Sequence, residues 1–139
     1  MIEQLVRDRL EALPSAFSLV AGLAELSLLT DAPAVTPAAY VFVKDKAGGE
    51  NSRMNGVLQR IEADVAIVIV VRNVADAAGA AALADAGDLE RAVTETMLGW
   101  EPDVVEEPFT FVSSAVVKAR AGVVFLEVVF GTAWTLEAA

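Results

Sequence analysis

Residues 65–71 limit what this chain can fold into more than any other feature. They read Val-Ala-Ile-Val-Ile-Val-Val, so a strand built from them must be buried on both faces. A membrane helix needs about 20 such residues, which this run does not supply. Their β-branched side chains also favour a strand over a helix. The sequence therefore predicts a strand over residues 59–72 in the middle of a sheet.

Further strand patterns flank this run on both sides. They cover residues 17–20, 38–43, 109–120 and 123–136. The last two are separated only by Ala121 and Gly122, which indicates a tight hairpin. Residues 44–58 are polar and rich in turn formers, and we interpret them as a long loop. A loop of this length in a compact domain is usually functional or mobile.

Two main helices are expected, one at the N-terminus and one between the hairpins. Apolar residues recur at helical spacing from Ile2 to Leu13, and Pro14 ends that pattern. The second helix should face inwards through Leu83, Leu89, Val93 and Met97. Gly87 favours a break in it, and Gly99 is placed to end it in a left-handed conformation, with Trp100 folding back on the core. A short helical turn through Leu26 is also expected.

These elements predict one α+β domain over residues 1–139. Its sheet should be mainly antiparallel, with about four strands and with the helices packed on one face. Alanine and valine supply most of the 55% hydrophobic content, which leaves apolar surface for a partner subunit. We therefore expect an oligomer.

The residue inventory removes most enzyme chemistry. The chain contains no cysteine and no histidine, so it lacks a thiol nucleophile, a thiolate metal site and the usual proton shuttle. The nearest approach to a catalytic or metal-binding group is the carboxylate pairs Glu106 with Glu107 and Asp85 with Asp88. Solvated charge is the better interpretation of both pairs. We predict no enzyme, catalytic residue, metal or cofactor, and keep a small carboxylate-based metal- or metabolite-binding domain as an alternative.

Charge patterning argues against some partners and suggests one surface. A net charge of −10 disfavours nucleic-acid binding, and neither a membrane segment nor a secretory signal is evident, so we expect synthesis in the cytoplasm. The region 44–60 carries basic and amide side chains in an otherwise acidic chain. These candidate assembly-contact residues are Lys44, Lys46, Arg53, Asn55 and Arg60. A solvated hairpin loop and a partner-binding arm explain them equally well.

Five short motifs occur in a characteristic order. They are Pro-Ala-Ala-Tyr-Val at 37–41, Gly-Val-Leu-Gln-Arg at 56–60, Val-Arg-Asn at 71–73, Leu-Gly-Trp-Glu-Pro at 98–102 and Phe-Gly-Thr at 130–132. In this order and spacing, the chain resembles the tail terminator, or tail completion, proteins of long-tailed bacteriophages. The resemblance covers most of the sequence.

This resemblance implies a structural role. It implies a virion protein that forms a ring, typically a hexamer, on the head-proximal end of the tail tube, ends tube polymerisation and provides a surface for joining the head. The implied partners are other copies of the chain, the tail tube protein and head-tail connector proteins, with DNA only as passing cargo. Assembly would take place in the host cytoplasm, and residues 44–58 would face the lumen or the tube. Another head-tail connector or tail-assembly protein is the alternative.

Overall fold

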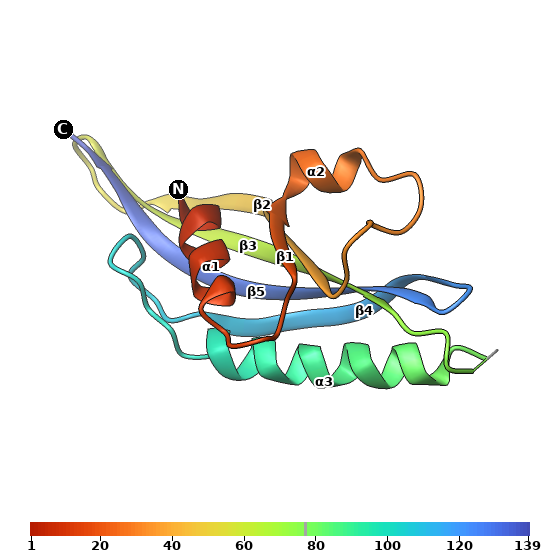
Figure 1. The fold of residues 1–139 in the computed structure, drawn as a ribbon. Helices are drawn as coiled ribbons and strands as arrows, with labels where there is room; N and C mark the ends of the chain where they lie inside the picture. Colours follow the sequence, from red (N-terminus) through yellow and green to blue (C-terminus); the bar gives the residue numbers. More distant parts are fainter. Residues whose placement is uncertain (77) are drawn as a thin grey trace.

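The central strand lies where its sequence requires. In the computed structural model, which describes residues 1–76 and 78–139, β3 (Val57–Arg72) is the middle strand of a five-stranded sheet with the order β1-β2-β3-β5-β4 (Figure 1). All residues from Val65 to Val71 are buried. β3 pairs antiparallel with β2 (Ala38–Asn51) and with β5 (Val123–Ala138). The α+β class and the mainly antiparallel sheet are confirmed.

The two edge strands differ in direction and length. β4 (Thr110–Arg120) pairs antiparallel with β5, and the predicted hairpin turn is confirmed, because Ala121 and Gly122 both have positive φ angles, of 53° and 78°. β1 (Leu19–Gly22) lies parallel to β2 at the other edge. It begins and ends two residues later than the strand predicted over residues 17–20. All five strands predicted from the sequence are therefore in the sheet, one more than the expected total of about four.

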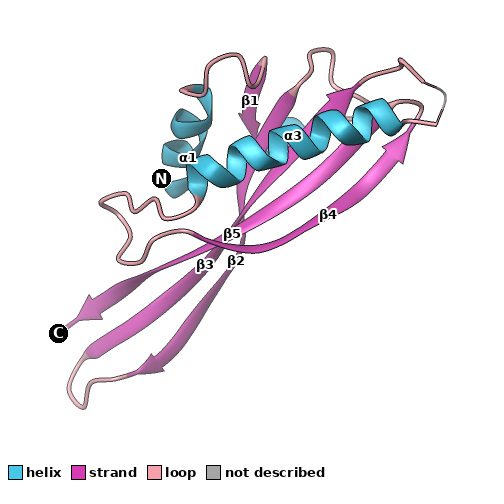
Figure 2. Ribbon diagram, turned by 90° about the horizontal axis from the view of Figure 1, so that it is seen from below, coloured by secondary structure: helices cyan, strands magenta, loops and turns pink. Residues whose placement is uncertain are grey.

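The two longer helices cover the same face of the sheet (Figure 2). α1 (Ile2–Glu11) and α3 (Ala80–Met97) share a buried core with the side chains of β3 and β5 that face them. Arg9 joins the two helices, because its guanidinium donates to the carbonyl oxygen of Thr96 over 2.9 Å and lies over the ring of Trp100. The short α2 (Leu23–Ser27) differs from the prediction, since Leu26 packs on the opposite face of the sheet.

The structure corrects two details of α3. The helix is continuous through Gly87, so the predicted break is wrong; packing on the sheet offsets a helix-propensity cost of about 1 kcal/mol for a glycine. Its buried positions include Ala82 and Ala86, whereas Leu83 is exposed rather than inward-facing. The buried positions share one face at helical spacing, and Leu83 falls outside it because each residue turns the helix by about 100°. The left-handed Gly99 and the packing of Trp100 on the core are confirmed.

The prediction of a loop over residues 44–58 is wrong for most of its length. β2 continues to Asn51 and β3 begins at Val57, so only residues 52–56 form the connection. Gly48 pairs with Ile61 of β3, and beside it the side-chain amide of Gln59 donates to the carbonyl oxygen of Gly49 over 2.8 Å. Strand pairing thus overrides the turn-forming composition.

A matched pair of phenylalanines tests where the core ends. Phe109 is fully buried and stacks on Trp100 with 5.5 Å between ring centroids, whereas Phe111 is exposed and meets Phe130 edge to face. We expect Phe109→Ala to lower the free energy of unfolding by about 3–5 kcal/mol and Phe111→Ala by about 1 kcal/mol. Urea denaturation at equal protein concentration measures both values. Equal losses would contradict this assignment of the core.

Candidate assembly surfaces

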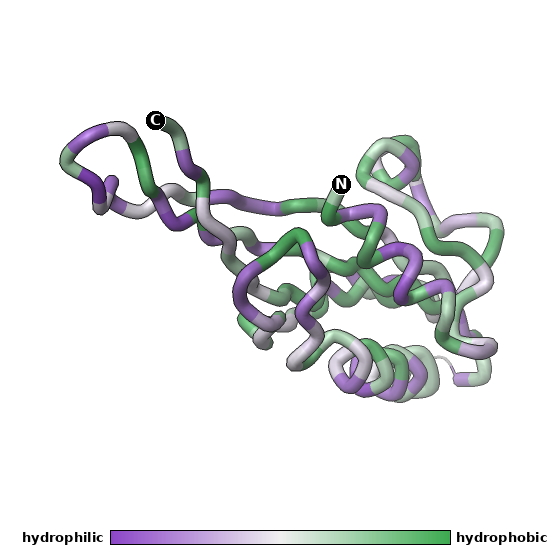
Figure 3. Tube along the Cα trace, turned by 90° about the vertical axis from the view of Figure 1, so that its left-hand side faces the viewer, coloured by the Kyte–Doolittle hydropathy of each residue, from purple (hydrophilic) through white to green (hydrophobic). Residues whose placement is uncertain are grey.

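Three strand ends form an arm that extends beyond the helical layer. The arm comprises residues 44–51 of β2, the connection 52–56, residues 57–62 of β3 and residues 133–138 of β5. Figure 2 shows it extending past α1 and α3, and the connection between β2 and β3 contains strongly hydrophilic stretches in Figure 3. Residues 44–52 are exposed at every position. The arm is therefore held together mainly by its own pairing.

Polar contacts fix the arm along its length. Lys44 pairs with Glu127 across 2.7 Å, and Arg53 pairs with Glu137 across 2.8 Å. Exposed pairs of this kind each contribute about 0–1 kcal/mol, so they set geometry more than stability. At the tip, the Oδ1 atom of Asn51 accepts hydrogen bonds from the backbone N–H groups of Arg53 and Leu58, at 3.1 and 2.9 Å. This side chain closes the connection.

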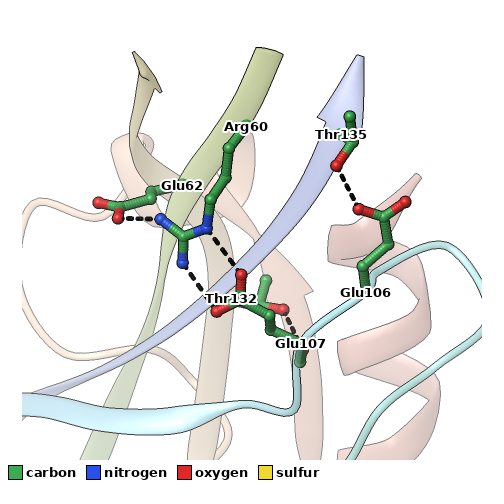
Figure 4. Close-up of polar contacts among 6 residues, drawn as sticks. All are labelled: Arg60, Glu62, Glu106, Glu107, Thr132 and Thr135. Atoms are coloured by element: carbon green, nitrogen blue, oxygen red, sulfur yellow. Dashed lines mark hydrogen bonds and ion pairs between the residues drawn. The ribbon is translucent and has the colours of Figure 1, made fainter. Parts of the chain in front are cut away.

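At the base of the arm, Arg60 fastens the segment between α3 and β4 to β3 (Figure 4). Its guanidinium donates two hydrogen bonds to the carboxylate of Glu107, each 2.7 Å long, and also pairs with Glu62. Bidentate arginine–carboxylate contacts are among the stronger and more geometrically defined ion pairs. These hydrogen bonds from Arg60 lower the pKa of Glu107, and those to Glu107 and Glu62 raise the pKa of Arg60.

Two threonines of β5 complete this attachment. The hydroxyl of Thr132 donates to the carbonyl oxygen of Glu107 at 2.7 Å, and the hydroxyl of Thr135 bonds the carboxylate of Glu106. The backbone N–H of Glu106 also donates to the carbonyl oxygen of Ala133. Glu106 and Glu107 therefore both hold the start of β4 in place, which gives these two carboxylates a structural use.

The five predicted contact residues all lie on the arm. Lys44, Arg53 and Arg60 use their charges in pairs within the chain, while Lys46 lies 5.9 Å from the ring centroid of Trp134. Asn55 is exposed in the connection. The structure thus brings these residues together, but gives most of their charges an internal partner.

Sequence reasoning missed the residue that the arm presents most openly. Met54, at the tip, is 100% exposed. A flexible, polarizable methionine in an otherwise polar connection is suited to an adaptable protein contact. The sequence did contain a signal for this residue, because Met54 is apolar and its neighbours in the predicted loop are polar. Composition alone does not single it out.

A second surface that sequence reasoning missed lies along β4. All residues from Thr110 to Arg120 are exposed, because α3 packs over β3 and β5 rather than over β4. A cleft between α3 and the start of β4 is lined by Gly87, Asp88 and Phe111, among others. Alternation along a strand indicates that it has two faces, but not whether a helix covers one of them.

Neither surface has the composition of a metal site. Across residues 1–76 and 78–139, no three or more of the carboxylate, histidine or cysteine side chains gather closely enough to hold a metal ion. None of the helices in the same ranges is long and apolar enough to cross a membrane. What the described residues offer is a projecting arm and an open sheet edge.

Both features are exposed surfaces of the kind through which structural subunits assemble. The comparison with protein families is specific: a model described as phage tail terminator protein matches residues 1–138, and the chain belongs to this family. It is therefore a structural protein of the phage tail and a component of the virion. No curated protein matches the chain.

Solved structures share the fold. A chain in the structure titled "Virion of native gene transfer agent (GTA) particle" superposes with a TM-score of 0.59 at 15% sequence identity. The match covers 96% of this chain and 92% of that one. At this identity the likeness shows the common fold, from the N-terminal helix to the last strand.

The ion pair at the base of the arm makes thermal stability depend on pH. Because Arg60 lowers the pKa of Glu107 in the folded state, ionised Glu107 stabilises the fold above its ordinary value of 4.5, and this stabilisation is lost as pH falls through the lowered pKa. We expect Glu107→Gln to melt at a lower temperature than wild type at pH 7, with the difference closing in acid.

Thermal melts from pH 7 to pH 3 measure this convergence. Glu50→Gln is the matched control, since Glu50 is an exposed residue of the arm that forms no ion pair within residues 1–76 and 78–139. A constant gap between Glu107→Gln and wild type at every pH would show that the contact is not electrostatic.

Proposed function

We propose that this chain forms a ring, in a hexamer, that binds the head-proximal end of the tail tube, ends tube polymerisation and provides the surface to which the head is joined. Its partners are then other copies of itself, the tail tube protein and the head-tail connector proteins. Membership of the tail terminator family supports the role. The arm is the structural observation that carries it, because a subunit that caps a tube must reach out of the plane of its own ring.

The arm suits this contact for two reasons. Its strands are hydrogen-bonded on both sides of β3 and joined by ion pairs, so little flexibility remains to be lost on binding. Its tip presents the apolar side chain of Met54, while Arg53 beside it is already paired. We infer that the tip contacts the tube protein, with Lys46 and Asn55 as further polar contacts.

Charge supports a channel through which DNA passes without binding. The chain carries a net charge of −10, and the charged residues that line the cleft beside α3 are mostly acidic: Asp88, Glu90 and Glu95 against Arg91. Carboxylates repel phosphates, so an acidic ring lets DNA move through it as cargo. We place the protein at the head-tail junction of the virion on this ground and on that of the family.

Rings should form and should stop tube growth. We expect the purified protein to have the mass of a closed oligomer, about six copies, and to appear as rings by electron microscopy. Added to polymerising tail tube protein of the same phage, it should shorten the tubes in proportion to its concentration, because each capped end stops growing. A stable monomer that leaves tube length unchanged would refute the proposed function.

The arm should be separable from the fold. We expect deletion of residues 48–55 to leave a folded protein, because none of these residues is buried, but to abolish tube capping. Met54→Asp should weaken capping, whereas Val74→Asp, a matched change at an exposed valine beyond the opposite end of β3, should not. Circular dichroism and tube-length measurements report these outcomes. An unfolded deletion variant together with a fully active Met54→Asp would show that the arm is only structural.

A further inference from the structure

Both edges of the sheet carry exposed apolar side chains. At one edge they lie on β4 and include Phe111, Val112, Val116 and Val117. At the other edge they lie on β1, α2 and the segment that follows, and they include Leu19, Leu23, Leu28 and Val35. Exposed apolar surface on both edges of a long sheet is an aggregation hazard unless a defined partner covers it.

The strand register places residues 116–118 of the β4 patch level with β1, whereas Phe111 lies further along the sheet. Leu19 of β1 pairs with Ala38, which continues across the sheet through Val70 and Phe125 to Lys118 of β4. The next row runs in the same way from Val20 to Val116. If two copies meet edge to edge with their strands aligned, β1 of one copy therefore faces residues 116–118 of the next.

The two edges also carry opposite charges. Residues 19–37 contain Glu25 and Asp31 and no lysine or arginine, and Arg7 of α1 is the cation that reaches this edge, at Gly22. At the level facing them, β4 carries Lys118 and Arg120, and neither forms an ion pair within residues 1–76 and 78–139. Lys118 lies over the ring of Phe125, on the face of the sheet against which α2 packs. Apolar contact and charge thus match between the two edges of the same chain.

We propose that the subunit interface of the ring joins β4 of one copy to β1 and α2 of the next, with residues 116–120 packed against Leu19 and Leu23 and with Lys118 and Arg120 directed towards Glu25 and Asp31. This inference rests on the proposed ring. The contact is heterologous, since two different surfaces of the chain meet, and heterologous contacts generate closed rings when the rotation between copies closes.

A second copy explains the paired surfaces better than an unrelated partner does. An unrelated protein would need a complement for one edge only, and the other edge would stay exposed. β4 also contains irregularities between Phe111 and Ser113 and between Val116 and Lys118, which interrupt its register with β5. Bulges of this kind discourage open-ended strand addition. Side-chain packing between copies, rather than a continuous backbone ladder, is therefore the expected form of the contact.

Cysteine cross-linking tests this arrangement directly, because the natural chain has no cysteine. The variant carrying both Leu19→Cys and Val117→Cys should give, on oxidation, a ladder of covalent multimers that ends at the ring size on a non-reducing gel. Each single variant should give no multimer above a dimer, since one cysteine per chain cannot extend a ladder. The control pair Met54→Cys with Val117→Cys should give no ladder, because the tip of the arm lies far along β3 from this row of the sheet.

A charge exchange provides a second measurement that does not depend on disulfide geometry. Lys118→Glu should weaken ring assembly roughly threefold per interface, and adding Asp31→Lys in the same chain should restore it, because the pair is then reversed. Native mass spectrometry across a dilution series measures the fraction of protein in rings for the single and the double variant. Lys46→Glu on the arm is the matched control and should leave the ring mass unchanged.

The outcomes separate the interface from the ring itself. Rings of normal mass without the Leu19–Val117 ladder and without a Lys118→Glu effect would overturn the interface and leave the proposed function standing. A ladder from the Met54–Val117 pair would overturn it in favour of an arm-to-edge contact. Monomers at every concentration, in wild type and variants alike, would overturn the interface and the proposed ring together.

Discussion

Burial of both faces of β3 is the constraint on which the rest of the structure depends. A strand whose residues 65–71 are all buried needs a strand on each side and cover above and below. β2 and β5 supply the pairing, α1 and α3 cover one face, and α2 packs against the other. The cover ends where the sequence of β3 turns polar, from Asp64 back to Val57. The arm is the half of the same hairpin that extends past the helices, which meet it only near Lys46 and Trp134.

The geometry of the arm is set by charged and polar side-chain contacts, whereas that of the core is set by apolar packing. Residues 44–62 have little to bury, so salt bridges and side-chain caps specify their geometry. Such pairs add little free energy individually, but the bidentate contact of Arg60 with Glu107 also fixes where β4 begins. One arginine therefore connects the arm to the open edge of the sheet. The two candidate assembly surfaces share a structural support although they lie on different strands.

Local rules predicted the fold well and the surfaces poorly. The buried run of β3, the turn at Ala121 and Gly122, and the left-handed Gly99 were predictable because each depends on its own side chains or backbone. The extension of β2 to Asn51 was not predictable, since pairing with β3 overrides residues that favour turns in isolation. The same holds for the exposed edge at β4, because periodicity cannot show which strands a helix will cover. The candidate residues were placed on the arm, but their internal ion pairs depend on tertiary geometry.

The positions of the two surfaces bear on how a ring could work. The row from Leu19 to Lys118 crosses the sheet at the end of β3 that precedes α3, whereas the arm lies at the other end. If copies join through the end of the sheet that precedes α3, the arm at the other end stays free in every copy. Cyclic symmetry then places all the arms at one height and pointing the same way, so that weak contacts at each tip combine by multivalency into firm binding of a tube end. In a ring closed through the arms, the same surface would have to bind both the neighbouring copy and the tube. Ring closure and tube binding would then no longer use separate surfaces.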